Sequence, residues 1–126
     1  MESDALSTVS SLRNEVETFV AEREWAQFHS PKNLSIAIAI EAAELMELFL
    51  WSSSEESDRA LADQATRLQV QEEIADVAIF LLGFCNRSGI DLSSAIRAKL
   101  KANAVKYPVN LARGTSAKYN SLRRNE

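Results

Sequence analysis

The chain has 126 residues, of which 46% are hydrophobic and 25% charged, and such fractions are typical of an ordinary globular domain. Its net charge of -4 at pH 7 argues against binding to nucleic acid polymers, because that binding depends on neutralising phosphates with Lys and Arg. With only 3 Gly and 2 Pro, few turns can be built, so the composition favours an all-α fold in a single domain spanning residues 1–126.

The first predicted helix covers residues 6–25. Apolar residues recur there in steps of three and four, from Leu6 to Val20, which is the pattern of an amphipathic helix. The preceding residues, MESDALS, are acidic and have no apolar core, so we expect no secretory signal and a cytoplasmic location. A connection follows at His29–Pro31, because a residue that precedes proline is biased away from helix.

The second predicted helix, residues 33–51, is apolar on nearly all sides. Its length would suit a membrane span, but its three carboxylates, Glu41, Glu44 and Glu47, make insertion costly, so we expect no membrane. Its apolar surface exceeds what a small bundle can hide, which favours self-association. The polar, serine-rich segment 52–64 then predicts a loop with at most one short helical turn.

The third predicted helix covers residues 65–87 and ends at Gly89. Asp91 can cap a fourth helix, which ends before Pro108. The side chains of the third helix that we expect to face inward are Leu68, Ile74, Val77, Ala78, Leu81, Leu82 and Cys85. Residues 109–126 show no convincing period and are basic, so we expect a partly ordered tail. The sequence therefore predicts a four-helix bundle.

Two acidic pairs lie inside these apolar helices. Glu41 and Glu44 are three residues apart, as are Glu73 and Asp76, and this spacing puts each pair on one helix face. Most such pairs are simply solvated, but here little of either helix is left for solvent. Antiparallel packing of the two helices could bring the pairs together, and a divalent cation would then offset their repulsion.

The oxygen ligands of such a site favour Mg²⁺, with Mn²⁺ as a second choice, over Zn²⁺, which prefers His or Cys. A di-iron site would need Glu-x-x-His motifs. His29 is the only histidine and belongs to no such motif. Iron is therefore the weaker hypothesis.

The fourth predicted helix carries a cationic ridge of Lys99, Asn103 and Lys106, followed by Tyr107. Alone, such a ridge is usually a solvated face. Beside an acidic metal cluster, it is a natural counter-charge for phosphate oxygens. Aromatic residues near His29 and at helix ends, including Trp25 and Trp51, could stack on a base, although most aromatics at such places are core.

The segments EAAEL and EEIAD resemble the paired acidic motifs of the MazG-like, all-α nucleotide pyrophosphohydrolases. The longer segments FVAEREWAQFHSPKNLSIAIAIEAAELMELFLW and DLSSAIRAKLKANAVKYPVNLAR are similar to the dCTP pyrophosphatase branch of that family. The likeness extends from about Phe19 to Tyr119. It implies hydrolysis of a nucleoside triphosphate between the α and β phosphates, with Mg²⁺, to give a monophosphate and pyrophosphate.

The resemblance also implies roles for individual residues. The metal ligands would be Glu41, Glu44, Glu73 and Asp76, and these acids with Lys99 would form the catalytic set. The phosphates and sugar would be held by Lys99, Asn103, Lys106 and Tyr107, and the base pocket would be lined by Trp25, His29 and Trp51. Related chains can have tyrosine where this chain has Phe80, so the choice between ribose and deoxyribose stays open. Cytosine is the leading base by similarity.

Family members assemble as dimers or dimers of dimers, so the resemblance implies a homotetramer or a dimer. Two other readings of the sequence compete with this enzyme. One is a non-catalytic helical module that binds a partner protein through its apolar second helix. The other is a different metal enzyme on the same bundle, such as a phosphoribosyl-ATP pyrophosphohydrolase.

Overall fold

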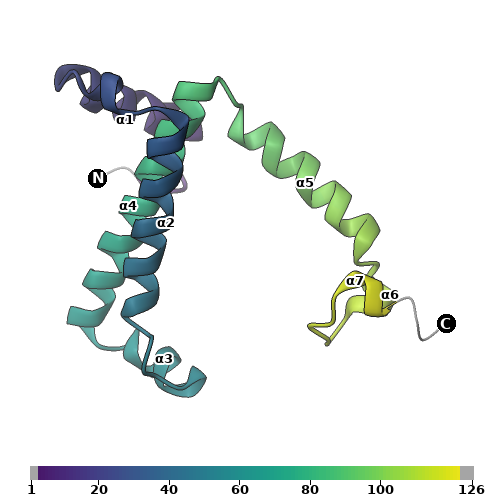
Figure 1. The fold of residues 1–126 in the computed structure, drawn as a ribbon. Helices are drawn as coiled ribbons and strands as arrows, with labels where there is room; N and C mark the ends of the chain where they lie inside the picture. The colour runs from purple at the N-terminus through teal and green to yellow at the C-terminus, as the bar shows by residue number, and fades with distance from the viewer. Residues whose placement is uncertain (1–2, 123–126) are drawn as a thin grey trace. The chain divides into compact units, whose positions relative to one another are not determined.

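The computed structural model describes residues 3–122, and these residues form helices and no strands (Figure 1). They make two compact units, one ending at Ile90 and the other beginning at Asp91. The helices of the first unit are α1 (Val9–Glu22), a 3₁₀ turn (Trp25–Phe28), α2 (Pro31–Glu47), α3 (Ser54–Ala60) and α4 (Gln64–Ser88). Those of the second are α5 (Leu92–Lys106), α6 (Val109–Ala112) and α7 (Tyr119–Leu122). The prediction of an all-α fold is confirmed for the described residues.

Helix α1 is shorter at both ends than the sequence predicts. It begins after Thr8, whose side chain accepts a hydrogen bond from the backbone N–H of Ser11, while the Ser11 hydroxyl accepts one from the Thr8 N–H. This capping box satisfies backbone donors that a helix start leaves unpaired. At the other end, Glu24 adopts a left-handed backbone with φ 52°, which stops the helix before the separate 3₁₀ turn.

The antiparallel pair α2 and α4 forms the centre of the first unit (Figure 1). Leu34 of α2 and Val70 of α4 are buried between the helices of this unit, as is the free thiol of Cys85, which confirms core packing for that cysteine. Helix α1 also packs on α4. Its Arg13 donates through Nε to Asn86 Oδ1 at 2.9 Å, and the Asn86 amide donates back to the Arg13 carbonyl oxygen at 2.9 Å.

Much of the apolar surface of α4 remains exposed. The expectation that Leu68, Ile74 and Leu81 face inward is wrong for a single chain, because they are 53%, 52% and 40% exposed. Helix α4 is apolar on more sides than α1 and α2 can cover. An apolar groove runs between α1 and α4, and its lining includes Leu12, Val16, Phe19, Ala78, Ile79 and Leu82.

The connection between α2 and α4 is more ordered than the sequence predicts. Helix α2 ends at Glu47, and residues 48–51 form turns that leave Trp51 93% exposed. The seven-residue helix α3 then begins at a capping box, in which the Ser53 N–H donates to Glu56 Oε2 at 2.7 Å. A segment expected to be mostly loop therefore carries a helix of almost two turns.

The second unit begins as the sequence predicts. The Asp91 side chain caps α5 by accepting from the backbone N–H of Ser94 at 2.8 Å, and α5 ends before Pro108. The described part of the predicted tail contains the short helices α6 and α7, and residues 123–126 lie outside the described residues. Along residues 3–122, none of the helices has the length and apolar character that crossing a membrane requires.

Candidate metal and nucleotide site

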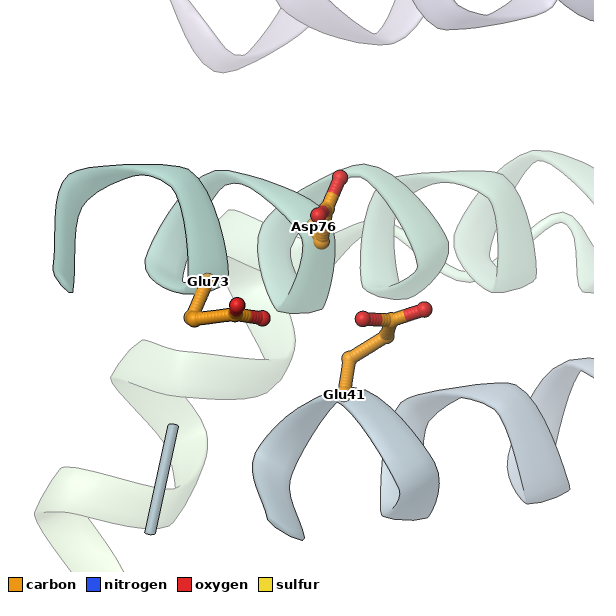
Figure 2. A group of neighbouring side chains, drawn as sticks. All are labelled: Glu41, Glu73 and Asp76. Atoms are coloured by element: carbon orange, nitrogen blue, oxygen red, sulfur yellow. The ribbon is translucent and has the colours of Figure 1, made fainter. Parts of the chain in front are cut away.

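Three carboxylates from two helices meet in the first unit. Glu41 comes from α2, whereas Glu73 and Asp76 lie one turn apart on α4. One oxygen from each of the three lies within 4.8 Å of the others. Figure 2 shows Glu41 and Glu73 in the space between the two helices, with Asp76 beside them on α4. Antiparallel packing thus brings these members of the two predicted acidic pairs together. We call Glu41, Glu73 and Asp76 the acidic group.

The surroundings of Glu41 and Glu73 disfavour negative charge on these two residues. Burial is the main cause that raises the pKa of Glu41 and Glu73 above the ordinary value, and neighbouring carboxylates add to it. Glu44 is among those neighbours for both residues. Its side chain is exposed and lies outside the acidic group, so its role as a fourth metal ligand stays a prediction.

One atom in the acidic group requires a partner. Glu73 Oε2 is buried and receives no hydrogen bond from the described residues. A buried carboxylate oxygen in this state is costly unless a proton or a cation reaches it. Mg²⁺ binds oxygens at about 2.1 Å, so two ligands of one ion lie at most about 4.2 Å apart, and the oxygens of the acidic group lie within 4.8 Å of one another. The residues present therefore fit a hard divalent cation.

An aromatic group lies beside these acids. The rings of Phe19 and Trp25 meet edge to face at a centroid distance of 5.8 Å, and Trp25 lies 6.4 Å from His29. His29 in turn lies 6.4 Å from Phe80, which follows Asp76 by one turn of α4. One turn rises about 5.4 Å, so this group of Phe19, Trp25, His29 and Phe80 begins about one turn from the acidic group.

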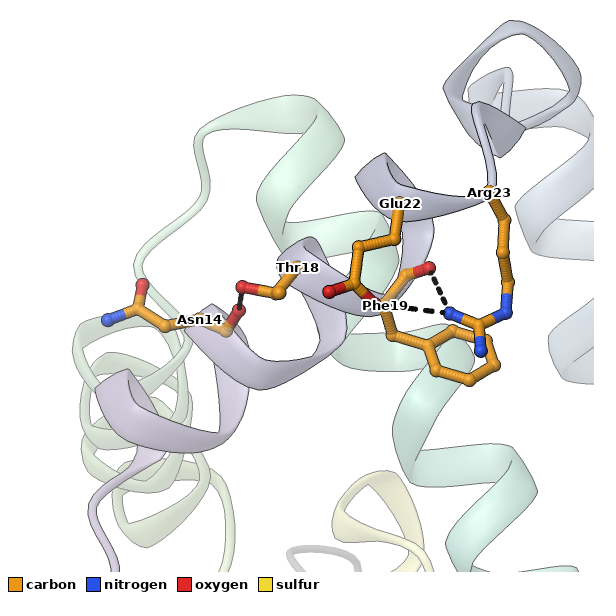
Figure 3. Close-up of polar contacts among 5 residues, drawn as sticks. All are labelled: Asn14, Thr18, Phe19, Glu22 and Arg23. Carbon is orange, nitrogen blue, oxygen red and sulfur yellow. Dashed lines mark hydrogen bonds and ion pairs between the residues drawn. The ribbon is translucent and has the colours of Figure 1, made fainter.

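Arg23 covers the far side of the aromatic group. Its guanidinium carbon lies 3.6 Å from the ring centroid of Phe19, and its NH1 donates to the Phe19 carbonyl oxygen at 3.0 Å (Figure 3). NH1 also pairs with Glu22 at 3.5 Å. Neither Phe19 nor Arg23 is among the predicted site residues, although their i, i+4 spacing at the end of α1 is a visible signal for this contact.

The structure separates Trp51 from the other predicted base-pocket residues. Trp25 and His29 precede α2, and Trp51 follows its last turn. Helix α2 has 17 residues, so it is about 25 Å long at 1.5 Å per residue. Within one chain, Trp51 therefore lies at the opposite end of α2 from Trp25 and His29.

The predicted phosphate ligands lie together on the second unit. Lys99, Asn103 and Lys106 follow one another at steps of four and three on α5, and Tyr107 caps its end. The Lys106 Nζ lies 5.4 Å from the ring centroid of Tyr119 in α7. The Tyr107 and Tyr119 rings meet edge to face at 6.1 Å. Tyr119 is not among the site residues that the sequence predicts.

Comparison with known proteins places the chain among its relatives. A model of the MazG-like family matches residues 36–122. The chain is 40% identical to dCTP pyrophosphatase 1 of Rattus norvegicus over 117 residues, which cover 93% of this chain and 69% of the rat protein. It is 39% identical to dCTP pyrophosphatase 1 of Homo sapiens over 115 residues, covering 91% and 68% of the two chains.

A solved structure shares the fold. The crystal structure of a pyrophosphatase from Archaeoglobus fulgidus is similar to this one with a TM-score of 0.74 at 40% sequence identity. The match covers 79% of this chain and 91% of the archaeal chain. The family model covers both acidic pairs and the whole of α5. The chain belongs to the MazG-like family.

Proposed function

We propose that this protein is a Mg²⁺-dependent nucleoside triphosphate pyrophosphohydrolase that cleaves between the α and β phosphates. Its products would be a nucleoside monophosphate and pyrophosphate. The names of the rat and human relatives favour dCTP, or another deoxynucleotide, as the substrate. The observation that carries the proposal is the buried, unpaired Glu73 oxygen within an acidic group contributed by two helices.

The acidic group would hold the cation, with Glu44 as a further ligand. A bound Mg²⁺ would polarise the phosphate that is attacked and lower the pKa of a bound water. Lys99 and Asn103 of α5 would stabilise charge on the departing pyrophosphate. Lys106 and Tyr107 would hold the remaining phosphate oxygens and the sugar.

The aromatic group would receive the base. Trp25 and His29 offer aromatic rings on which a base could stack. His29 contacts Phe80, which lies on α4 with Asp76. Because Phe80 has no hydroxyl, it cannot donate a hydrogen bond to the sugar. Selection of deoxyribose over ribose would therefore have to rest on other contacts.

We propose that the active form is a homo-oligomer in the cytoplasm, either a homotetramer or a dimer. The exposed apolar side chains of α4 support self-association, since a second copy would remove them from water. The position of Trp51 supports it independently. If Trp51 contributes to the base pocket, it must reach the pocket of another copy, because it lies far from Trp25 and His29 in its own chain.

The test is a panel of the common ribonucleoside and deoxynucleoside triphosphates, each incubated with the protein and Mg²⁺. We expect monophosphate and pyrophosphate in equal amounts, with fastest turnover for a deoxynucleotide. Glu41→Gln should abolish turnover, whereas Glu17→Gln, the same change on an exposed face of α1, should preserve it. An absence of turnover with every nucleotide, or full turnover by Glu41→Gln, would refute the proposal.

The exposed apolar surface also favours a second candidate, a non-catalytic helical module that binds a partner protein. The two candidates differ in their response to metal. An ion that binds only the folded state raises its thermal stability, so Mg²⁺ should raise the melting temperature of the enzyme. The interaction module should melt at the same temperature with and without Mg²⁺.

A further inference from the structure

The residues after α5 form a folded clasp rather than a plain extension. Helices α6 and α7 pack on each other, and the chain reverses between them near Gly114, whose φ is 74°. Leu122 at the end of α7 is 9% exposed, so it anchors this segment within the second unit. We call residues 109–122 the C-terminal clasp. The clasp brings Tyr119 to the end of α5.

Tyr119 contacts two residues that the proposed function assigns to the substrate. Its ring faces the ammonium group of Lys106, with Nζ 5.4 Å from the centroid. The same ring meets Tyr107 at an interplanar angle of 84°. A cation over an aromatic face is attracted by the negative charge of that face, and edge-to-face rings are a favoured aromatic geometry. One side chain therefore restrains both neighbours.

These restraints matter most for Lys106, which has a long and flexible side chain. A free lysine loses rotamer freedom when it binds an anion, and this loss weakens binding. If the Tyr119 ring already holds the ammonium group near the end of α5, less freedom is lost when phosphate arrives. A ring contact also leaves the ammonium N–H donors available for phosphate oxygens.

We propose that Tyr119 is a positioning residue for the triphosphate, which it serves by holding Lys106 and Tyr107 in place. This inference rests on the proposed function, because that function assigns phosphate binding to Lys106 and Tyr107. The contacts involve the ring of Tyr119, so phenylalanine should replace it. The anchoring of the clasp depends instead on Leu122, since Tyr119 is 44% exposed.

The test compares Tyr119→Phe, which keeps the aromatic ring, with Tyr119→Leu, which keeps apolar bulk without a π face. Tyr119→Leu should raise KM for the best nucleotide about threefold to tenfold with little change in kcat, as expected for loss of weak contacts. Tyr119→Phe should match the wild type. Melting temperatures should be alike for the two variants, whereas Leu122→Ala, which cuts the anchor of the clasp, should melt lower.

Calorimetric titration with inorganic pyrophosphate and Mg²⁺ separates this inference from the proposed function. Weaker pyrophosphate binding by Tyr119→Leu than by Tyr119→Phe supports the positioning role, even if the wild type hydrolyses no nucleotide and the proposed function fails. If the wild type is active but both variants share its KM and pyrophosphate affinity, the positioning role is refuted and the enzyme stands. Equal losses in both variants would also refute it, because the ring would not be the cause.

Discussion

The two units of this chain place charged side chains in different ways. In the first unit, the acidic group exists only because α2 and α4 pack against each other, since Glu41 precedes Glu73 and Asp76 by more than thirty residues along the chain. In the second unit, Lys99, Asn103 and Lys106 share a face through the periodicity of α5 alone. Tertiary packing thus builds the acidic site, and local helix geometry builds the cationic ridge.

Substitutions in the acidic group should cause the largest loss of kcat/KM. Replacing Glu41 or Glu73 with glutamine removes a charged ligand from a site that both helices must complete. We expect each change to lower kcat/KM by at least about 100-fold. Steady-state kinetics on the best nucleotide would measure the loss. Glu17→Gln is the matched control, and a similar loss in that variant would show that the effect is not specific to the site.

The cationic ridge should give a smaller effect. Lys99→Met keeps most of the side-chain length but removes the charge that would stabilise the departing pyrophosphate. We expect kcat/KM to fall about 10-fold to 100-fold, because one electrostatic contact to the reacting phosphates is lost. Affinity for the metal alone should be unchanged, since the metal ligands lie in the first unit. A loss of metal affinity in Lys99→Met would contradict this separation of roles.

The free energy of unfolding should depend on pH and on metal, because Glu41 and Glu73 of the first unit take up protons or a cation. Glu41 and Glu73 have pKa values raised above 4.5, so the folded protein holds these protons more tightly than the unfolded chain does. Without metal, their contribution to the free energy of unfolding therefore falls as pH rises from 4.5 through the raised pKa values. Mg²⁺ should restore several degrees of melting temperature at pH 7 and progressively less as the pH is lowered.

Glutamine variants sharpen that test. Glu73→Gln removes a carboxylate that burial and like charges both disfavour, so the metal-free variant should melt at or above the wild-type temperature at pH 7. The same variant should gain little from Mg²⁺. A metal-free Glu73→Gln protein that melts well below the wild type would mean that the Glu73 charge has another stabilising partner.

The smallest expected effects concern the backbone, with one site in each unit. Glu24 and Gly114 both have positive φ, at 52° and 74°. A left-handed backbone costs a non-glycine residue about 1 kcal/mol. Glu24→Gly should therefore raise the free energy of unfolding by up to that amount, and Gly114→Ala should lower it by up to the same amount. A Cβ at Gly114 would meet nothing within 4 Å, so strain alone should act there. Chemical denaturation would measure both changes, and shifts of the same sign would contradict the argument.

Local signals in the sequence predicted much of the fold. Asp91 caps α5 and Pro31 occupies the first turn of α2, as the capping preferences indicate. The same signals did not predict where α1 begins and ends. Glu24 ends α1 through an unusual backbone conformation that no residue-type rule would place at a glutamate, and Thr8 starts the helix after the first apolar residue of the stripe.

The sequence predicted the acidic group of the site better than it predicted the base pocket. The spacing of Glu73 and Asp76 puts them on one face, and antiparallel packing then brings Glu41 to them. The base pocket was harder to predict, because Trp25 and Trp51 look equivalent in sequence yet lie beyond opposite ends of α2.

The burial of α4 was also harder to predict. Leu68 was expected to face inward but is exposed, because an apolar stripe does not reveal whether the residues that cover it come from the same chain. The contacts of Tyr119 depend on the reversal near Gly114, which has no periodic signal.

The most direct test of the central claim is a titration with Mn²⁺, followed by electron paramagnetic resonance, in place of Mg²⁺. At pH 7 we expect the wild type and Glu17→Gln to bind Mn²⁺, and Glu41→Gln and Glu73→Gln to bind it far more weakly. Equal Mn²⁺ binding by all four proteins would show that the acidic group between α2 and α4 is not the metal site.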